Sequence, residues 1–218
     1  MKINRFLSIS LLCFCAFYIF PQTVKADKAK DCLDKTSAAL GKAGSLAAHF
    51  TMQVKDTSNK ISESFEGDIE WKGEKFHLDT PDMEIWFDGK TQWVLQKEWD
   101  EVNVSELSPQ EAQALNPVTL LLAYKQSAKC KYLKTLKDAK GREVHEIEMT
   151  STAKNNDITK ITVQINADYF PIKIHLIYKN KIENMIHIKT YTKNANLPDS
   201  KFVFDAKKYP EVEIIDLR

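Results

Sequence analysis

The amino-acid sequence predicts a mainly β (α+β) fold: an incomplete, strongly curved antiparallel β-barrel of about eleven strands with three helices on its open side. Most of the chain consists of short segments in which apolar and polar residues alternate, which is the period of a half-buried strand. The connections between these segments are too short for crossover helices, so consecutive strands must be antiparallel neighbours.

Residues 1–26 have the features of a cleaved secretory signal peptide. Lys2 and Arg5 precede an apolar run of 15 residues, Phe6–Phe20, which is shorter than the roughly 20 residues that a membrane-spanning helix needs. Pro21 ends this run, and Val24-Lys25-Ala26 provides small residues for cleavage. We therefore expect a mature chain of residues 27–218 that forms one soluble, exported domain.

The mature chain is predicted to begin with a helix from Asp27 to about Leu40, because apolar residues recur there at intervals of three and four. Gly41 and Gly44 are expected to end this helix. Five alternating segments and a sixth that starts at Trp99 then predict the first half of the sheet; the five are residues 48–54, 65–71, 76–78, 83–87 and 93–95. Asp88-Gly89 is the favoured pair for a two-residue hairpin turn between the last two.

Two capped helices are predicted to interrupt the sheet. Ser108-Pro109-Gln110-Glu111 combines an N-cap serine, a proline at the first helical position and a glutamate for a capping box. Asn116-Pro117 repeats the cap and the proline before Val118–Tyr124, which is apolar on nearly every side. Such a helix must be covered, so it either packs into an ordinary core or closes the mouth of a cavity.

Alternating segments resume after these helices and predict the second half of the sheet. They are residues 132–136, 144–149, 158–165, 172–178 and 185–191, followed by a last alternating stretch over residues 212–215. No change of composition marks a domain boundary along this part of the chain.

The charge balance and the motif content argue against several classes of function. Without residues 1–26 the chain has 28 basic and 30 acidic residues, so nucleic acid is not an expected partner. No nucleophile elbow, phosphate loop or dinucleotide fingerprint occurs, and the five histidines lack metal-ligand spacing. We therefore predict neither catalytic residues nor a metal site.

Two cysteines remain in the mature chain, Cys32 and Cys130. In an oxidising compartment they could pair, which in the chain-entropy model is worth on the order of 4 kcal/mol. The alternative is two buried thiols, and the spacing alone does not decide between the two.

All four tryptophans fall between residues 71 and 99. They can belong to an ordinary sheet core, or they can line a cavity, since a curved sheet with this many strands has an interior that few helices can fill.

Five segments resemble the family of the outer-membrane lipoprotein carrier protein LolA, in the same order along the chain. They are Leu46-Ala47-Ala48-His49-Phe50-Thr51-Met52-Gln53-Val54, Gly67-Asp68-Ile69-Glu70-Trp71, Phe87-Asp88-Gly89-Lys90-Thr91-Gln92-Trp93, Asn116-Pro117-Val118-Thr119-Leu120-Leu121-Leu122, and Lys201-Phe202-Val203-Phe204 with Pro210 and residues 212–216. The resemblance implies helices that form a lid over a hydrophobic, acyl-binding cavity, with residues 116–122 as the lid helix.

The resemblance also implies a function and its partners. Members of this family accept acylated lipoproteins from an inner-membrane lipoprotein-release ABC transporter and carry them across the periplasm to the outer membrane, where a receptor can take them over. The carrier itself uses no cofactor. We therefore expect a monomeric, periplasmic carrier that is not an enzyme. Lining residues chosen by strand alternation are Phe50, Met52, Phe65, Ile69, Trp71, Phe76, Leu78, Ile85, Trp93 and Leu95, with Leu120 and Leu121 on the lid.

One departure from the family pattern concerns the lid. The family usually has a proline and an arginine at the turn after its second strand, whereas this turn is Lys72-Gly73-Glu74-Lys75. Lys72 or Lys75 could replace the arginine only as a single-point donor. Other hypotheses therefore stay open: a LolA-like carrier or sensor for another lipid, an interaction module with a filled core, and an exported enzyme with an unrecognised site.

Overall fold

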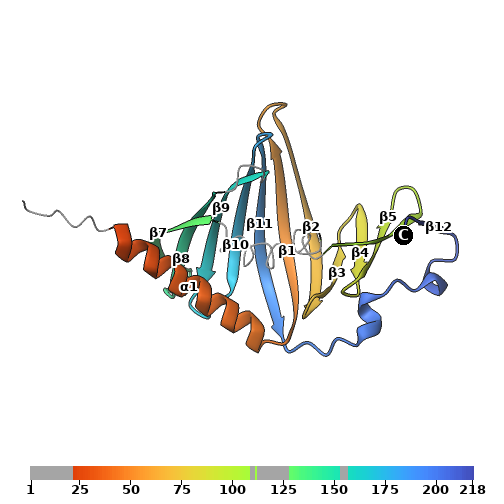
Figure 1. Ribbon diagram of the computed structural model, residues 1–218, viewed down its shortest axis with the longest axis horizontal. Coiled ribbons are helices and arrows are strands. Elements are labelled where there is room, and N and C mark those ends of the chain that lie inside the picture. Colours follow the sequence, from red (N-terminus) through yellow and green to blue (C-terminus); the bar gives the residue numbers. More distant parts are fainter. Residues whose placement is uncertain (1–21, 109–110, 112–127, 153–156) are drawn as a thin grey trace, which may run out of the picture.

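A twelve-stranded sheet dominates this computed structural model, which describes residues 22–108, 111, 128–152 and 157–218 (Figure 1). The strand order is β12-β6-β5-β4-β3-β2-β1-β11-β10-β9-β8-β7. Neighbouring strands are antiparallel, except that β12 runs parallel to β6. The sheet is curved and does not close, so β7 and β12 are its two edges.

The chain order explains why almost every pair is antiparallel. The elements are α1 (Gln22–Lys42), β1 (Ser45–Asp56), β2 (Ile61–Lys72), β3 (Lys75–Asp79), β4 (Met83–Phe87), β5 (Thr91–Gln96), β6 (Glu101–Glu106), β7 (Ala128–Lys137), β8 (Glu143–Ser151), β9 (Ile158–Asn166), β10 (Pro171–Tyr178), β11 (Ile182–Lys193), the 3₁₀ helices η2 (Asp199–Phe202) and η3 (Ala206–Lys208), and β12 (Glu213–Asp216). The two halves, β1–β6 and β7–β11, are meanders, and they meet where β1 pairs with β11. The predicted curved antiparallel sheet is confirmed, with one strand more than the expected number of about eleven.

The predicted bounds of the first helix are wrong at both ends. The helix α1 begins at Gln22, five residues before Asp27, and passes through Gly41 to Lys42. Pro21 directly precedes it in the sequence, and no other helix-breaking residue lies between Pro21 and Gly41. The left-handed residue that follows the helix is Gly44, whose φ is 65°. No helix of the described residues is long and apolar enough to cross a membrane.

Two further expectations concern the segment after β5. Trp99 does not begin a strand, because it lies in the turn before β6, where Asp100 takes a left-handed φ of 49°. The capping box is confirmed: the Ser108 backbone N–H and hydroxyl donate to Glu111 Oε2 at 2.8 and 2.7 Å, and the Glu111 N–H donates to Ser108 Oγ at 3.4 Å. Most of the two helices predicted over residues 108–124 lies outside the described residues.

The inner face of the sheet, on which α1 packs, holds the main apolar core. Leu33, Cys32 and Leu40 of α1 are buried and belong to the same apolar cluster as residues of both meanders. Gly67 of β2 lies opposite Phe50 of β1, and a Cβ atom on Gly67 would lie 2.7 Å from Phe50 Cζ and 2.8 Å from the Asp79 carbonyl oxygen. The absence of a side chain at Gly67 therefore lets the Phe50 ring lie flat across the sheet.

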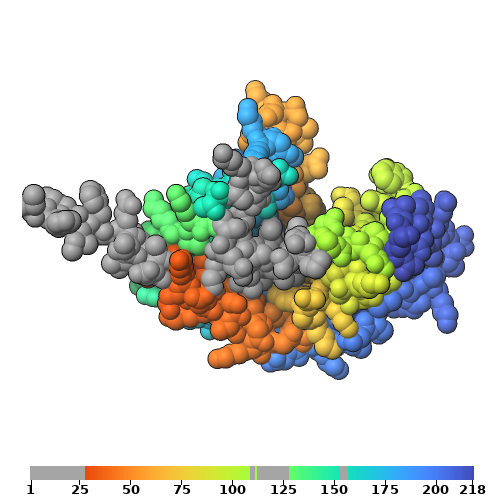
Figure 2. Space-filling view, viewed as in Figure 1, coloured from red at the N-terminus to blue at the C-terminus, as the bar shows by residue number. Residues whose placement is uncertain are grey.

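The outer face of β4, β5 and β6 is covered by the C-terminal segment, residues 195–212 (Figure 1). The space-filling view shows this segment, in blue, lying directly against the yellow and yellow-green strands (Figure 2). Phe204, Tyr209 and Val212 of this segment pack on Trp86, Trp93, Leu95, Val102 and Val104. The Trp86 ring meets the Phe204 ring edge-on at 5.2 Å and the Tyr209 ring at 5.7 Å. These contacts form a second, smaller core.

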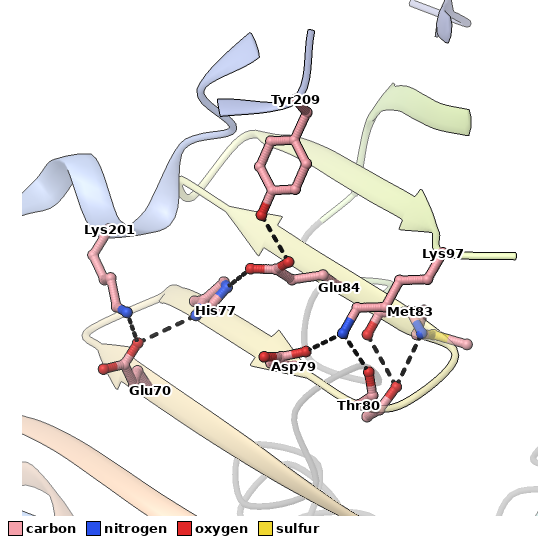
Figure 3. A network of polar contacts seen from close by, with 9 residues as sticks. All are labelled: Glu70, His77, Asp79, Thr80, Met83, Glu84, Lys97, Lys201 and Tyr209. Carbon is pink, nitrogen blue, oxygen red and sulfur yellow. Dashed lines mark hydrogen bonds and ion pairs between the residues drawn. The ribbon is translucent and has the colours of Figure 1, made fainter. Parts of the chain in front are cut away.

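A polar network holds the C-terminal segment on this face (Figure 3). His77 lies between two carboxylates, with Nδ1 3.2 Å from Glu70 Oε2 and Nε2 2.7 Å from Glu84 Oε1. The Tyr209 hydroxyl donates to Glu84 Oε2 at 2.9 Å, and Lys201 pairs with Glu70 at 3.0 Å. Burial disfavours the charged form of Glu84, but hydrogen bonds from His77 and Tyr209 outweigh it and hold the Glu84 pKa below its ordinary value.

Gly67→Ala should destabilise the protein by about 1–3 kcal/mol, because the added Cβ overlaps Phe50 and a backbone carbonyl that cannot rotate away. Gly41→Ala is the matched control, since a Cβ there meets nothing within 4 Å and alanine favours the helix by up to about 1 kcal/mol. Urea unfolding of both variants measures the difference. A Gly67→Ala variant as stable as the wild type would contradict the close packing of Phe50 on β2.

Acid should weaken the attachment of the C-terminal segment through Glu84. A carboxyl whose folded-state pKa is lowered stabilises the fold fully above its unfolded pKa, and this stability is lost as the pH falls through the folded-state pKa. Glu84→Gln should therefore lose less stability than the wild type between neutral pH and pH values below 4.5, the ordinary value for Glu84. Urea unfolding across this range tests it, with Glu74→Gln in the exposed β2–β3 turn as control. Equal slopes for the wild type and Glu84→Gln would refute this role.

Candidate functional site on the inner face of the sheet

Eight of the predicted lining residues share the inner face of β1–β4. Residues directly opposite each other in an antiparallel pair project from the same face, and the register places Met52 opposite Phe65, Ile69 opposite Leu78, and Trp71 opposite Phe76. Leu78 in turn faces Ile85. The eight are Phe50, Met52, Phe65, Ile69, Trp71, Phe76, Leu78 and Ile85, and all belong to the main apolar cluster or pack against it.

Trp93 and Leu95 do not join this face, which corrects the prediction that they line the same surface. The register of β4 and β5 pairs Ile85 with Val94 and Trp86 with Trp93, so Val94 is the inner residue of β5. Trp93 and Leu95 project outward and pack under the C-terminal segment. Both alternating sets of β5 contain apolar residues, so alternation within the strand does not identify its inner side. Leu120 and Leu121 lie outside the described residues.

The apolar face continues across the second meander, which was not among the predicted lining. Ile174 of β10 lies opposite both Ile186 of β11 and Val163 of β9, and each of the three is 0–3% exposed. Ile147 and Met149 of β8 extend the surface to the edge of the sheet. The sequence of β8–β11 alternates like that of β1–β3, so the same pattern predicts an inner side for these strands as well.

The two halves of this face differ in how they are covered. On the side of the second meander the helix α1 packs against β7, and its Lys28 ammonium lies 4.0 Å from the centre of the Tyr132 ring. Over β1–β5, Met52, Phe65, Leu78 and Val94 remain only partly buried at the border of the cluster. Strand side chains that keep some exposure beside a continuous apolar core are the part of this face that a hydrocarbon chain can reach.

Polar groups beneath α1 are satisfied within the protein. The Tyr132 hydroxyl lies 2.8 Å from His145 Nδ1 and 2.7 Å from Thr135 Oγ1. Burial lowers the pKa of His145, which favours the neutral ring. The Tyr191 hydroxyl donates to the Pro171 carbonyl oxygen at 2.7 Å, and burial raises the pKa of Tyr191. These contacts engage the four side chains in hydrogen bonds within the fold.

Lys72 and Lys75 bind the C-terminal segment. Their ammonium groups contact the two carboxylate oxygens of Asp199 at 3.1 and 2.7 Å, and Lys72 also donates to the Leu197 carbonyl at 3.2 Å. The turn that carries an arginine in the family pattern thus anchors residues 197–199 in this protein.

The cysteines form no disulfide with each other. Cys32 is buried on α1, and burial is the main cause that raises the pKa of its thiol to about 11. Among the described residues, no group of His, Cys, Asp and Glu side chains is placed to hold a metal ion. A pocket between the β3–β4 and β5–β6 turns is lined by Pro81, Asp82, Gln96, Lys97, Glu98 and Trp99, a largely polar set that does not suit an acyl chain.

Comparison of the fold with solved structures found proteins of the same architecture. An uncharacterized conserved protein from Thermus thermophilus superposes with a TM-score of 0.58 at 10% identity, over 87% of this chain and 99% of that one. MucB superposes with a TM-score of 0.51 at 17% identity, over 83% of this chain and 64% of that one. A putative outer membrane lipoprotein-sorting protein domain from Vibrio parahaemolyticus gives 0.46 at 14% identity, over 81% and 97%.

Comparison of the sequence gives the family. A search of curated proteins found no match. The family described as outer membrane lipoprotein carrier protein LolA matches residues 19–180, which cover β1–β10 and therefore most of the apolar face. The chain accordingly belongs to the family of the outer membrane lipoprotein carrier protein LolA.

Proposed function

We propose that this protein is a periplasmic carrier that holds the acyl chains of lipoproteins against the inner face of its sheet and carries lipoproteins from the inner to the outer membrane. The observation that carries the proposal is the continuous apolar face of β1–β5, which ends in the partly buried Met52, Phe65, Leu78 and Val94. Membership in the LolA family supports the choice of an acylated protein as cargo. The apolar side chains of this face suit binding rather than catalysis.

The energetics of acyl binding favour a carrier with a protected site. Each methylene that is transferred from water to an apolar site contributes about 0.8 kcal/mol, so a carrier has to replace the burial that an acyl chain has in the membrane. Several fully buried chains would bind too tightly to be released. In a carrier, the free energy of opening its own apolar contacts therefore has to offset part of the free energy of acyl binding. In this protein these contacts lie between the inner face and the elements that pack on it.

The expected partners follow from this role. An inner-membrane lipoprotein-release ABC transporter would deliver the cargo, and a receptor at the outer membrane would accept it. The segment 1–26, with its basic start and apolar run, supports export to the periplasm. We expect the mature protein to act as a monomer without a cofactor.

Brominated acyl chains test the proposed site, because bromine quenches a tryptophan that it touches. Trp71 is the tryptophan of the inner cluster, Trp86 and Trp93 lie under the C-terminal segment, and Trp99 is 67% exposed. Titration of the purified protein with a brominated lipopeptide should therefore quench its fluorescence. Trp71→Phe should abolish most of the quenching, whereas Trp99→Phe should retain it.

Other outcomes of these experiments would contradict the proposed carrier function or its ligand. If no ligand quenches the wild-type protein, and native mass spectrometry of protein purified from cells detects no bound lipid, the face is a filled core and the carrier function fails. If quenching persists in Trp71→Phe, the acyl chains bind elsewhere. Binding of fatty acids or phospholipids without lipopeptides would indicate a carrier of another lipid.

A further inference from the structure

One polar side chain interrupts the apolar inner face near the turn that joins β10 to β11. Asn184 of β11 lies opposite Leu176 of β10 and Val54 of β1, two residues from the buried Ile186, so its amide projects from the inner face. Its Oδ1 atom is the one buried side-chain nitrogen or oxygen of the described residues that has no hydrogen-bond partner. An acceptor left in this state costs free energy, which a ligand that supplies a donor would recover.

Neighbouring residues determine from which kind of group Asn184 Oδ1 can accept a hydrogen bond. The Tyr178 hydroxyl lies within reach of the Asn184 side chain; burial raises the pKa of Tyr178, and the hydrogen bond from Asn184 offsets part of that rise. The amide nitrogen is thus directed to Tyr178, and the oxygen is the atom left for a ligand. Asn184 as a whole is only partly buried, although its Oδ1 atom is buried.

A carboxylate lies near the same place. Glu63 of β2 and Asn184 of β11 are both opposite Val54, one on each side, so about 10 Å separates their backbones, twice the spacing of adjacent strands. Glu63 is exposed. The two side chains thus place acceptor oxygens on both sides of Val54, where the apolar surface of Met52 and Phe65 ends.

Acceptors at the end of an acyl-binding surface discriminate between kinds of lipid. Where the acyl chains of a diacyl phosphatidylcholine join the glycerol, the ester oxygens only accept hydrogen bonds. An acylated N-terminal cysteine carries N–H groups at the corresponding position, from its amide or amine and from the following peptide bonds. A site that offers unpartnered acceptors favours the second class, because only that class satisfies them.

We propose that Asn184, supported by Tyr178 and Glu63, forms a polar subsite that accepts a hydrogen bond from the N–H groups at the lipidated end of the cargo, and so selects acylated peptides over diacyl lipids that have no N–H or O–H donor. This inference rests on the proposed carrier function and adds a determinant of its specificity.

Two probes with the same palmitoyl chains test the subsite. One is a cysteinyl peptide whose sulfur carries a dipalmitoylglyceryl group, and the other is dipalmitoyl phosphatidylcholine, which has no N–H or O–H donor. Asn184→Leu should weaken binding of the lipopeptide about 5- to 30-fold, the effect of one hydrogen bond to a buried acceptor, and should leave phosphatidylcholine binding unchanged. Asn184→Asp keeps acceptor oxygens and should retain the preference for the lipopeptide.

The matched control is Gln53→Leu, which replaces an amide on the adjacent strand β1 that faces outward opposite Met185. It should alter neither affinity. Unchanged phosphatidylcholine binding shows that Asn184→Leu is folded. If the wild type binds both probes and Asn184→Leu binds the lipopeptide as tightly, the subsite is refuted and the carrier function stands. If the wild type binds neither probe, the carrier function itself fails.

Discussion

The antiparallel register of the sheet is the constraint on which the rest of the structure depends. Because opposite residues of neighbouring strands share a face, the register from β7 to β4, with bulges or irregularities in the β1–β11, β9–β10 and β7–β8 pairs, gathers the apolar side chains of nine strands on the inner side. Gly67 shows how tightly this arrangement is set, since the ring of Phe50 occupies the space of its missing side chain. A slip of one residue would bring polar groups inward along a whole strand.

The two faces of the sheet are covered by different kinds of contact, and the difference matches the different roles proposed for the two faces. Outside, Trp86 is enclosed by Phe204 and Tyr209, and the charges around it are paired through His77 and Glu84. That side is a finished core with specific hydrogen bonds. Inside, over β1–β5, the contacts of Met52, Phe65, Leu78 and Val94 are apolar, and the hydrophobic effect that acts on them carries no directional preference. Binding is therefore expected on the face where the packing is least specific.

Much of the fold could be predicted from the sequence, because period-two alternation and short turns leave few alternatives for the topology. The side of each strand was harder to assign. In β1–β3 only one set of residues is apolar, and the eight lining residues chosen from β1–β4 do share a face. In β5 both sets contain apolar residues, and the prediction of Trp93 rather than Val94 as an inner residue was wrong. The anchoring of residues 197–199 by Lys72 and Lys75 depends on contacts distant in sequence, which no local pattern encodes.

The two edges of the sheet differ in what they offer to another chain. On one side β12 pairs in parallel with β6, so residues 213–216 provide hydrogen-bond partners for the backbone of β6. On the other, β7 presents exposed lysines at positions 129, 131, 134 and 137. Two copies that aligned their β7 strands would bring these ammonium groups together, and like charges in such a pairing repel. The lysines of β7 thus disfavour edge-to-edge pairing of two copies, to which an open sheet with so large an apolar face would otherwise be prone.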